Sequence, residues 1–150
     1  MPGTEPRRLP GIRPVGRFSA AQRIRKRSEF QEIQSSGRRV MTAHFVLLLR
    51  ARPLDRALPS ARIGLTVSRK VGNAVLRNRA KRLLREAFRA TRDLWADDLD
   101  LVVIVKRATR ELGLEAVVRE LRRAEPRILR GTHQARKDRE KLAVDLARDG

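Results

Sequence analysis

The segment 61–90 passes from one apolar repeat to another within a few residues, and this change strongly constrains the fold. Ile63, Leu65 and Val67 alternate with small or polar residues, which predicts a strand with one buried face. After Asn73, which is suited to cap a helix, apolar residues recur every three or four positions. They are Leu76, Ala80, Leu83, Leu84, Ala87 and Phe88. This second repeat predicts an amphipathic helix that packs on a sheet containing the preceding strand.

Two other apolar segments predict further strands. Residues 44–51 and 99–107 are rich in Val, Leu and Ile, and a shorter strand is expected near Val40. Together with residues 61–69 they predict a small sheet of about four strands. With helices at both ends of the chain, the expected class is α+β.

Helices are also expected on both sides of this unit. Before Gly37, which provides a C-terminal stop, Ser28 begins the spacing of a capping box. A last helix is expected from about Leu114, and Pro126 is expected to kink or end it. These helices would complete one compact domain.

The two ends of the chain differ in composition from the middle. Residues 1–17 contain prolines, glycines and arginines without a periodic pattern, which predicts a disordered basic arm. Residues 131–150 mix both signs of charge and offer little to a core, so an extended or weakly helical tail is expected. We therefore expect a single folded domain over residues 18–130.

Positive charge is concentrated on the predicted central helix. The chain has a net charge of +19 and a pI near 11.8, which is typical of proteins that bind nucleic acid. Within the helix, Arg77, Lys81, Arg85 and Arg89 are four residues apart, and Arg82 lies beside them. Each like-charged pair at this spacing opposes folding by roughly 0.2–0.5 kcal/mol. A phosphate backbone would remove this cost, so these five residues are predicted to bind nucleic acid.

Other classes of function find little support in the sequence. The chain has no cysteine, and its two histidines stand apart, which argues against thiol, zinc or general-base chemistry. Asp93, Asp97, Asp98 and Asp100 are expected to form a solvated turn and not a magnesium site. No apolar run approaches the length of a membrane span. We expect a soluble cytoplasmic protein with no membrane partner, no catalytic residue and no metal ligand of its own.

The segment 62–89, RIGLTVSRKVGNAVLRNRAKRLLREAFR, resembles the signature segment of the bacterial ribonuclease P protein component, including its Arg-Asn-Arg core. The upstream EFQEIQSSG and HFVLLL are similar to the first helix and following strand of that family. The downstream LDLVVIVKR is similar to its last strand. The resemblance spans about residues 22–125.

The resemblance implies an accessory protein that binds a large catalytic RNA and assists removal of the 5′ leader from precursor tRNA. The hydrolysis is metal-dependent, and Mg²⁺ is held chiefly by the RNA, so no cofactor is expected on the protein. Catalytic RNA and precursor tRNA are the implied partners. DNA is not, because the basic helix follows a strand and not the tight turn of a helix-turn-helix.

The resemblance also assigns residues to two surfaces. Those expected to contact RNA, with the ridge residue Arg89 added, are Arg69, Lys70, Arg77, Asn78, Arg79, Lys81, Arg82, Arg85 and Arg89. Those expected on the leader-facing surface are Phe30, Val46 and Leu48. A structural hydrogen bond for Asn78 and plain core packing for Phe30 remain alternatives.

Two positions depart from the family pattern. Where relatives usually carry aromatics facing the leader, this chain has Gln34 and Leu48. Stacking is worth roughly 1–3 kcal/mol per base, so leader recognition is expected to be weaker and more dependent on charge.

The implied architecture is ribosomal S5 domain 2-like, with a left-handed β-α-β crossover where general rules favour a right-handed one. Two other functions remain alternatives at this stage: a general or ribosome-associated RNA-binding protein without a role in tRNA processing, and a protein nuclease that acts alone.

Overall fold

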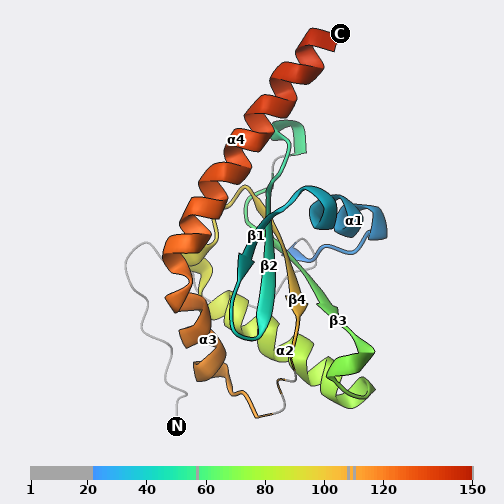
Figure 1. Ribbon diagram of the computed structural model, residues 1–150, viewed down its shortest axis with the longest axis vertical. Coiled ribbons are helices and arrows are strands. Elements are labelled where there is room, and N and C mark those ends of the chain that lie inside the picture. The colour runs from blue at the N-terminus through green and yellow to red at the C-terminus, as the bar shows by residue number, and fades with distance from the viewer. Residues whose placement is uncertain (1–21, 57, 108, 110, 150) are drawn as a thin grey trace.

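The computed structural model describes residues 22–56, 58–107, 109 and 111–149, which form a four-stranded sheet with helices on both faces (Figure 1). The predicted disordered arm, residues 1–17, lies outside the described residues. In chain order the elements are α1 (Arg27–Ser36), β1 (Arg38–Met41), β2 (Phe45–Ala51), β3 (Arg62–Val67), α2 (Ala74–Ala90), β4 (Leu99–Val105), α3 (Leu114–Arg123) and α4 (Glu125–Asp149).

The strands lie in the order β1-β2-β4-β3. β2 is antiparallel to both β1 and β4, whereas β3 is parallel to β4 and connected to it through α2. The predicted α+β class with four strands and a β-α-β unit is confirmed. The hand of that connection stays a prediction.

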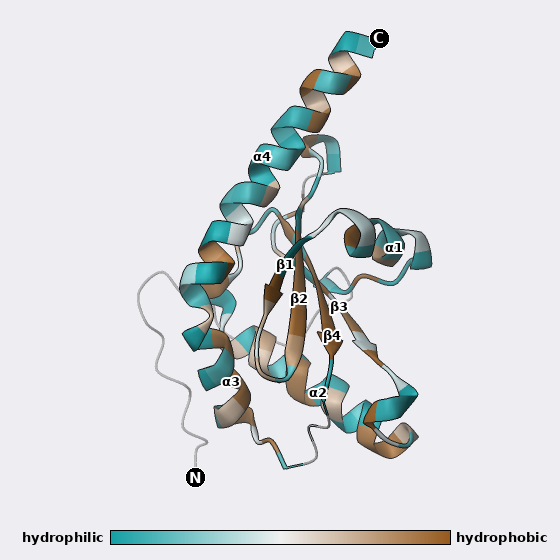
Figure 2. Cartoon of the chain, viewed as in Figure 1, coloured by the Kyte–Doolittle hydropathy of each residue, from teal (hydrophilic) through white to brown (hydrophobic). Residues whose placement is uncertain are grey.

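Alternate residues of the strands pack against different helices. The larger core joins the sheet to α2, α3 and the start of α4, and Ile63, Leu65 and Val67 face it as predicted. A smaller core lies under α1 on the other face. Its members are Ile24, Ile33, Val46, Leu48 and Val102, with Phe30 and Ile104 packed against them. Figure 2 shows the hydrophobic strands between helices whose outer sides are hydrophilic.

Local features fix both ends of α2. Asn73 caps the helix as predicted, because its side-chain oxygen accepts a hydrogen bond from the Leu76 N–H at 3.0 Å. Gly72 has a φ of 152°, which disfavours any residue with a Cβ, and a Cβ there would lie 2.7 Å from the Leu76 side chain. At the other end, Phe88 stacks on Trp95 with ring centroids 5.7 Å apart.

The C-terminal residues correct the sequence interpretation. Residues 131–149 are not extended or weakly helical, because α4 runs without a break to Asp149. The predicted helix from Leu114, α3, ends at Arg123, three residues before Pro126, as expected. Pro126 itself lies in the first turn of α4, where the missing N–H needs no partner. Small residues let α4 approach the sheet: a Cβ on Gly131 would lie 2.9 Å from the Leu49 side chain. These contacts with β1 and β2 are tertiary and leave little trace in the local sequence.

The N-terminal helix corrects a smaller point. α1 begins at Arg27 with Lys26 as its N-cap, and no side chain caps it, so Ser28 does not open a capping box. Gly37 ends the helix as predicted. None of the helices in the described part of the chain is both long enough and apolar enough to cross a membrane.

Candidate nucleic-acid interface

Five cationic side chains lie along α2, four of them on sides that its buried residues leave free and Arg77 at the border of the buried side. They are Arg77, Lys81, Arg82, Arg85 and Arg89, called the α2 ridge below. Within the described part of the chain, Arg77, Lys81 and Arg82 form no ion pair with an acid. Burial and the nearby Arg23 guanidinium lower the pKa of Arg85. The ridge is therefore a surface of concentrated and largely uncompensated positive charge.

Arg79 lies apart from this ridge. Its guanidinium donates hydrogen bonds to the backbone oxygens of Thr109 at 3.2 Å and Leu112 at 3.3 Å. It therefore ties α2 to the segment between β4 and α3, so its first role is structural. The other N–H groups of the Arg79 guanidinium take no part in these two hydrogen bonds.

Asn78 is exposed, and its side chain makes no hydrogen bond to any residue that the structure describes. The alternative of a structural hydrogen bond to the neighbouring backbone is thus not found. Next to it, the Nε of Arg77 is buried and has no hydrogen-bond partner among the described residues. The exposed Asn78 amide is therefore the polar group that is available to an external partner.

Arg69 and Lys70 lie in a short 3-10 turn, Arg69–Val71, between the end of β3 and the start of α2. Both side chains are exposed. They connect the sheet to the first turn of α2, where free N–H groups also favour anions. Positive charge therefore continues from the ridge to the C-terminal end of β3.

A row of side chains crosses all four strands at the edge of the smaller core. Met41 pairs with Val46, Val46 with Ile104, and Ile104 with Thr66, so these four residues, called the open row below, share one face. Met41 is 48% exposed, Ile104 and Thr66 are partly buried, and Val46 is 7% exposed. Thr66 is three residues before Arg69, which places the row next to the basic turn.

The structure places two of the predicted leader-facing residues inside the smaller core. Leu48 is 2% exposed and packs beneath α1, and Val46 offers little surface. Phe30 is partly buried and lies over Gly64, where a Cβ would come within 2.6 Å of its ring. Gln34 is exposed on α1. Phe30 thus serves first as a packing contact that seats α1 on the sheet.

Sequence reasoning missed Met41, Thr66 and Ile104 as members of this face. Strand alternation places Thr66 on the other face of the sheet from Ile63 and Leu65. Its neighbours in the row were not predictable in this way, because the row depends on the register between strands that are far apart in the chain.

The predicted solvated acidic turn is wrong for Asp100. Asp100 is 3% exposed and accepts hydrogen bonds from Arg52 at 3.1 Å and from Arg62 at 2.7 and 2.9 Å. Arg62 also reaches Glu29 of α1 at 2.5 Å. Hydrogen bonds to Asp100 raise the pKa of Arg62. This buried network fixes α1 over the sheet, because it joins β3, β4 and α1 to Arg52, the residue that follows β2.

The side chains of two neighbouring acids, Asp93 and Asp98, also form ion pairs, whereas Asp97 is exposed. Asp93 pairs with Arg122. Asp98 pairs with Arg136 at 2.9 Å and with Arg139 at 3.1 Å, which lowers the pKa of Asp98 and ties the loop before β4 to α4. In the described part of the chain, no three His, Asp or Glu side chains gather as a metal-ligand set.

Glu120 joins α3 to the β1–β2 hairpin. Its carboxylate accepts hydrogen bonds from the Thr42 hydroxyl at 2.6 Å and from the His44 backbone N–H at 3.0 Å, and lies 2.7 Å from the His44 ring. Burial raises the pKa of Glu120, but these hydrogen bonds outweigh it and leave that pKa lowered. His44 therefore has a structural partner.

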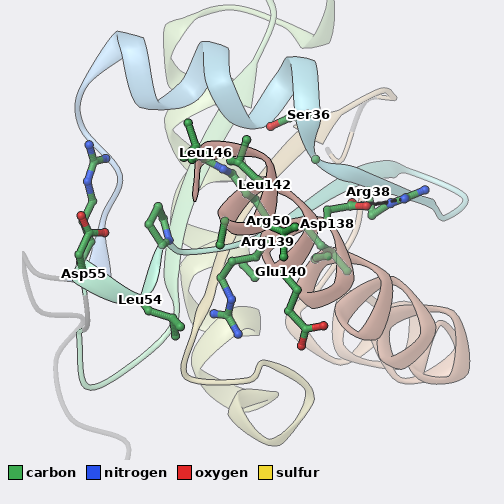
Figure 3. Close-up of a pocket in the computed structure, with 18 residues that line it drawn as sticks. Ser36, Arg38, Arg50, Leu54, Asp55, Asp138, Arg139, Glu140, Leu142 and Leu146 are labelled. Atoms are coloured by element: carbon green, nitrogen blue, oxygen red, sulfur yellow. Dashed lines mark hydrogen bonds and ion pairs between the residues drawn. The ribbon is translucent and has the colours of Figure 1, made fainter. Parts of the chain in front are cut away.

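A broad groove lies between α4, the end of α1 and residues 49–56 (Figure 3). Its volume of about 1340 Å³ exceeds that of small-molecule sites, which are roughly 300–1,000 Å³. Arg38 and Asp138 on its wall pair with each other at 2.7 Å. None of the residues that line it belongs to α2. It is a space beneath the projecting helix, separate from the basic surface.

Comparisons with known proteins agree on one family. The family model described as Ribonuclease P matches residues 18–129. The ribonuclease P protein component of Syntrophus aciditrophicus is 42% identical over 101 residues, which are 67% of this chain and 82% of the relative. That of Gluconacetobacter diazotrophicus is 46% identical over 104 residues, or 69% of this chain and 87% of the relative. The solved ribonuclease P protein from Thermotoga maritima superposes with a TM-score of 0.60 at 29% identity, covering 70% of this chain and 96% of the other.

Proposed function

The chain belongs to the ribonuclease P protein family, and from this premise we propose that the α2 ridge binds the catalytic RNA and the open row receives the 5′ leader of precursor tRNA. The chain is an accessory protein subunit of ribonuclease P, an endoribonuclease of tRNA processing. The alternative of an RNA-binding protein outside tRNA processing has no support in the comparisons.

The observation that carries the proposal is the lack of acidic partners for Arg77, Lys81 and Arg82 among the described residues. The repulsion along the helix costs folding free energy, and phosphate groups would turn that cost into affinity by releasing counterions. Asn78, exposed within the ridge, can donate and accept hydrogen bonds at a ribose 2′-hydroxyl. The ridge therefore suits an RNA partner.

The proposed path of the leader follows from the position of the open row, which adjoins the basic residues before α2. The open row leads at Thr66 to the exposed Arg69 and Lys70, and from there to α2. No member of the row is aromatic, so its contact with bases is aliphatic and affinity comes mainly from the phosphates. If adding leader nucleotides raised precursor affinity as much as it does for an aromatic-rich relative, this part of the proposal would be wrong.

We assign neither catalysis nor metal binding to residues of this chain. The proposal places hydrolysis in the RNA subunit, with Mg²⁺ held chiefly by that RNA. It places the protein in the cytoplasm, with its RNA partners. The role of the protein is then to bind and position the two RNAs.

The function is tested by cleavage of a precursor tRNA by a bacterial ribonuclease P RNA at low magnesium, with and without the protein. We expect stimulation by the wild type and loss of most of it in Arg77→Gln/Arg82→Gln. Arg79 is left intact because its substitution would also loosen the contact with Thr109 and Leu112.

Arg56→Gln is the control, because Arg56 is also exposed but lies in the turn between β2 and β3. It should stimulate as the wild type does. Absence of stimulation by the wild type, together with tight binding to unrelated RNAs, would contradict the proposed function.

A further inference from the structure

The outer side of α3 and α4 bears a long line of positive charge. The cations are Arg119, Arg123, Arg130, Lys137, Lys141 and Arg148, called the outer stripe below. At about 100° per residue they fall within a sector of about 40° on an ideal helix. The helical register continues through the junction, because the Ile128 N–H donates to the Ala124 oxygen at 2.9 Å.

The buried residues of both helices lie on the opposite side. Val117, Leu121, Ala124, Ile128 and Ala135 face the core and are each at most 4% exposed. Up to Ala135 the outer stripe is therefore the side of the two helices that the rest of the domain leaves uncovered, and residues 140–149 of α4 are exposed on all sides. Figure 2 shows the hydrophilic colour along this side of α4.

The two signs of charge are segregated around these helices. All six cations of the outer stripe are exposed, and none forms an ion pair with an acid among the described residues. The acids lie elsewhere: Glu120 binds the β1–β2 hairpin and Asp138 binds Arg38. Glu115, Glu140 and Asp145 are the other acids nearest the stripe, and they lie roughly 40–60° outside its edges on an ideal helix, Asp145 on one side and the two glutamates on the other.

Much of the stripe lies outside the residues that the family model matches. The family model ends at residue 129, so Arg130, Lys137, Lys141 and Arg148 follow it. From Arg119 to Arg148 the stripe rises about 44 Å. Figure 1 shows α4 projecting beyond the sheet, far from the start of α2.

We propose that the outer stripe is a second RNA-binding surface, which follows the phosphate backbone of a helical segment of RNA. Charge complementarity favours this partner, because a row of unpaired cations over this length matches a row of phosphates. A membrane fits less well, because an interfacial helix needs a continuous line of large apolar residues opposite its cations. Here that side is buried in the core from Val117 to Ala135, although Leu142 and Leu146 are exposed farther along α4. The inference rests on the proposed function in one respect: the RNA is taken to be the RNA with which this ribonuclease P subunit acts.

The test is the salt dependence of binding by the full chain to two probes, a bacterial ribonuclease P RNA and an RNA duplex of about two dozen base pairs. Arg130→Gln/Lys137→Gln/Lys141→Gln should make the negative slope of log affinity against log salt shallower by about 2 to 3, because each lost phosphate contact reduces its magnitude by roughly 0.7–0.9. Arg130→Lys/Lys137→Arg/Lys141→Arg keeps the charge and should leave the slope unchanged. Thermal midpoints of both variants should match the wild type.

An unchanged slope for the Gln variant would overturn the inference. Loss of binding to anionic phospholipid vesicles with RNA binding intact would overturn it as well. This test and the test of the proposed function have separate outcomes. If the wild type did not stimulate precursor cleavage but the Gln variant made the salt slope shallower, the proposed function would be contradicted and the second RNA-binding surface would still be supported.

Discussion

The arginine residues around Asp100 at the start of β4 and those along α2 have opposite surroundings. Arg52 and Arg62 converge on the buried carboxylate of Asp100, whereas Arg77 and Arg82 meet no acid in the described part of the chain. The first pair holds strands and α1 together, and the second leaves its charge for a partner. The same residue type thus stabilises the fold in one region and destabilises it slightly in the other, and the position of carboxylates decides which.

The largest effect is expected where the paired arginines lose their acid. Asp100→Asn leaves the guanidinium groups of Arg52 and Arg62 without a buried counter-charge, and should lower the free energy of unfolding by about 3–5 kcal/mol. Chemical denaturation measures this loss. Asp97→Asn is the control, because Asp97 is exposed nearby, and it should change stability by no more than about 0.5 kcal/mol. Equal effects of the two variants would mean that the network does not stabilise the fold.

A smaller effect is expected where a carboxylate binds mainly neutral donors. The pKa of Glu120 is lowered in the folded protein, so its stabilising contribution is complete above the ordinary pKa of about 4.3 and is lost as pH falls through the lower folded value. Glu120→Gln should reduce stability by about 1 kcal/mol at neutral pH and flatten its decline below about pH 4. Denaturation across this pH range measures both, with exposed Glu115→Gln as control. An unaltered acid decline in Glu120→Gln would contradict the assignment.

The smallest change in stability is expected on α2. Arg77→Gln/Arg82→Gln removes unpaired cations, so the free energy of unfolding should stay within about 0.5 kcal/mol of the wild type or rise slightly. Denaturation under the same conditions provides the comparison with Asp100→Asn. A loss as large as that of Asp100→Asn would show that these arginines also stabilise the fold.

Local patterns in the sequence were sufficient for the strands, for α2 and for its cap, because each depends on side chains close together in the chain. Asn73 and the apolar repeat after it are an example. The position of Asp100 was not predictable in this way, because its partners Arg52 and Arg62 lie in or next to other strands.

The candidate site was predicted on α2 and only partly on the sheet. The spacing of the cations along α2 is a property of a single helix. The open row requires three strand registers, and the buried position of Leu48 requires the placement of α1. The helix after residue 130 was missed because β1, β2 and the Arg38–Asp138 pair support it.

The most direct test of the account is the salt dependence of binding to a bacterial ribonuclease P RNA by Arg77→Gln/Arg82→Gln and by Arg56→Gln. If the unpaired arginines of α2 contact phosphates, the double variant should reduce the magnitude of the slope of log affinity against log salt by about 1.4 to 1.8, and the control should leave it as in the wild type. Equal slopes in all three proteins would contradict the claim that α2 binds the RNA.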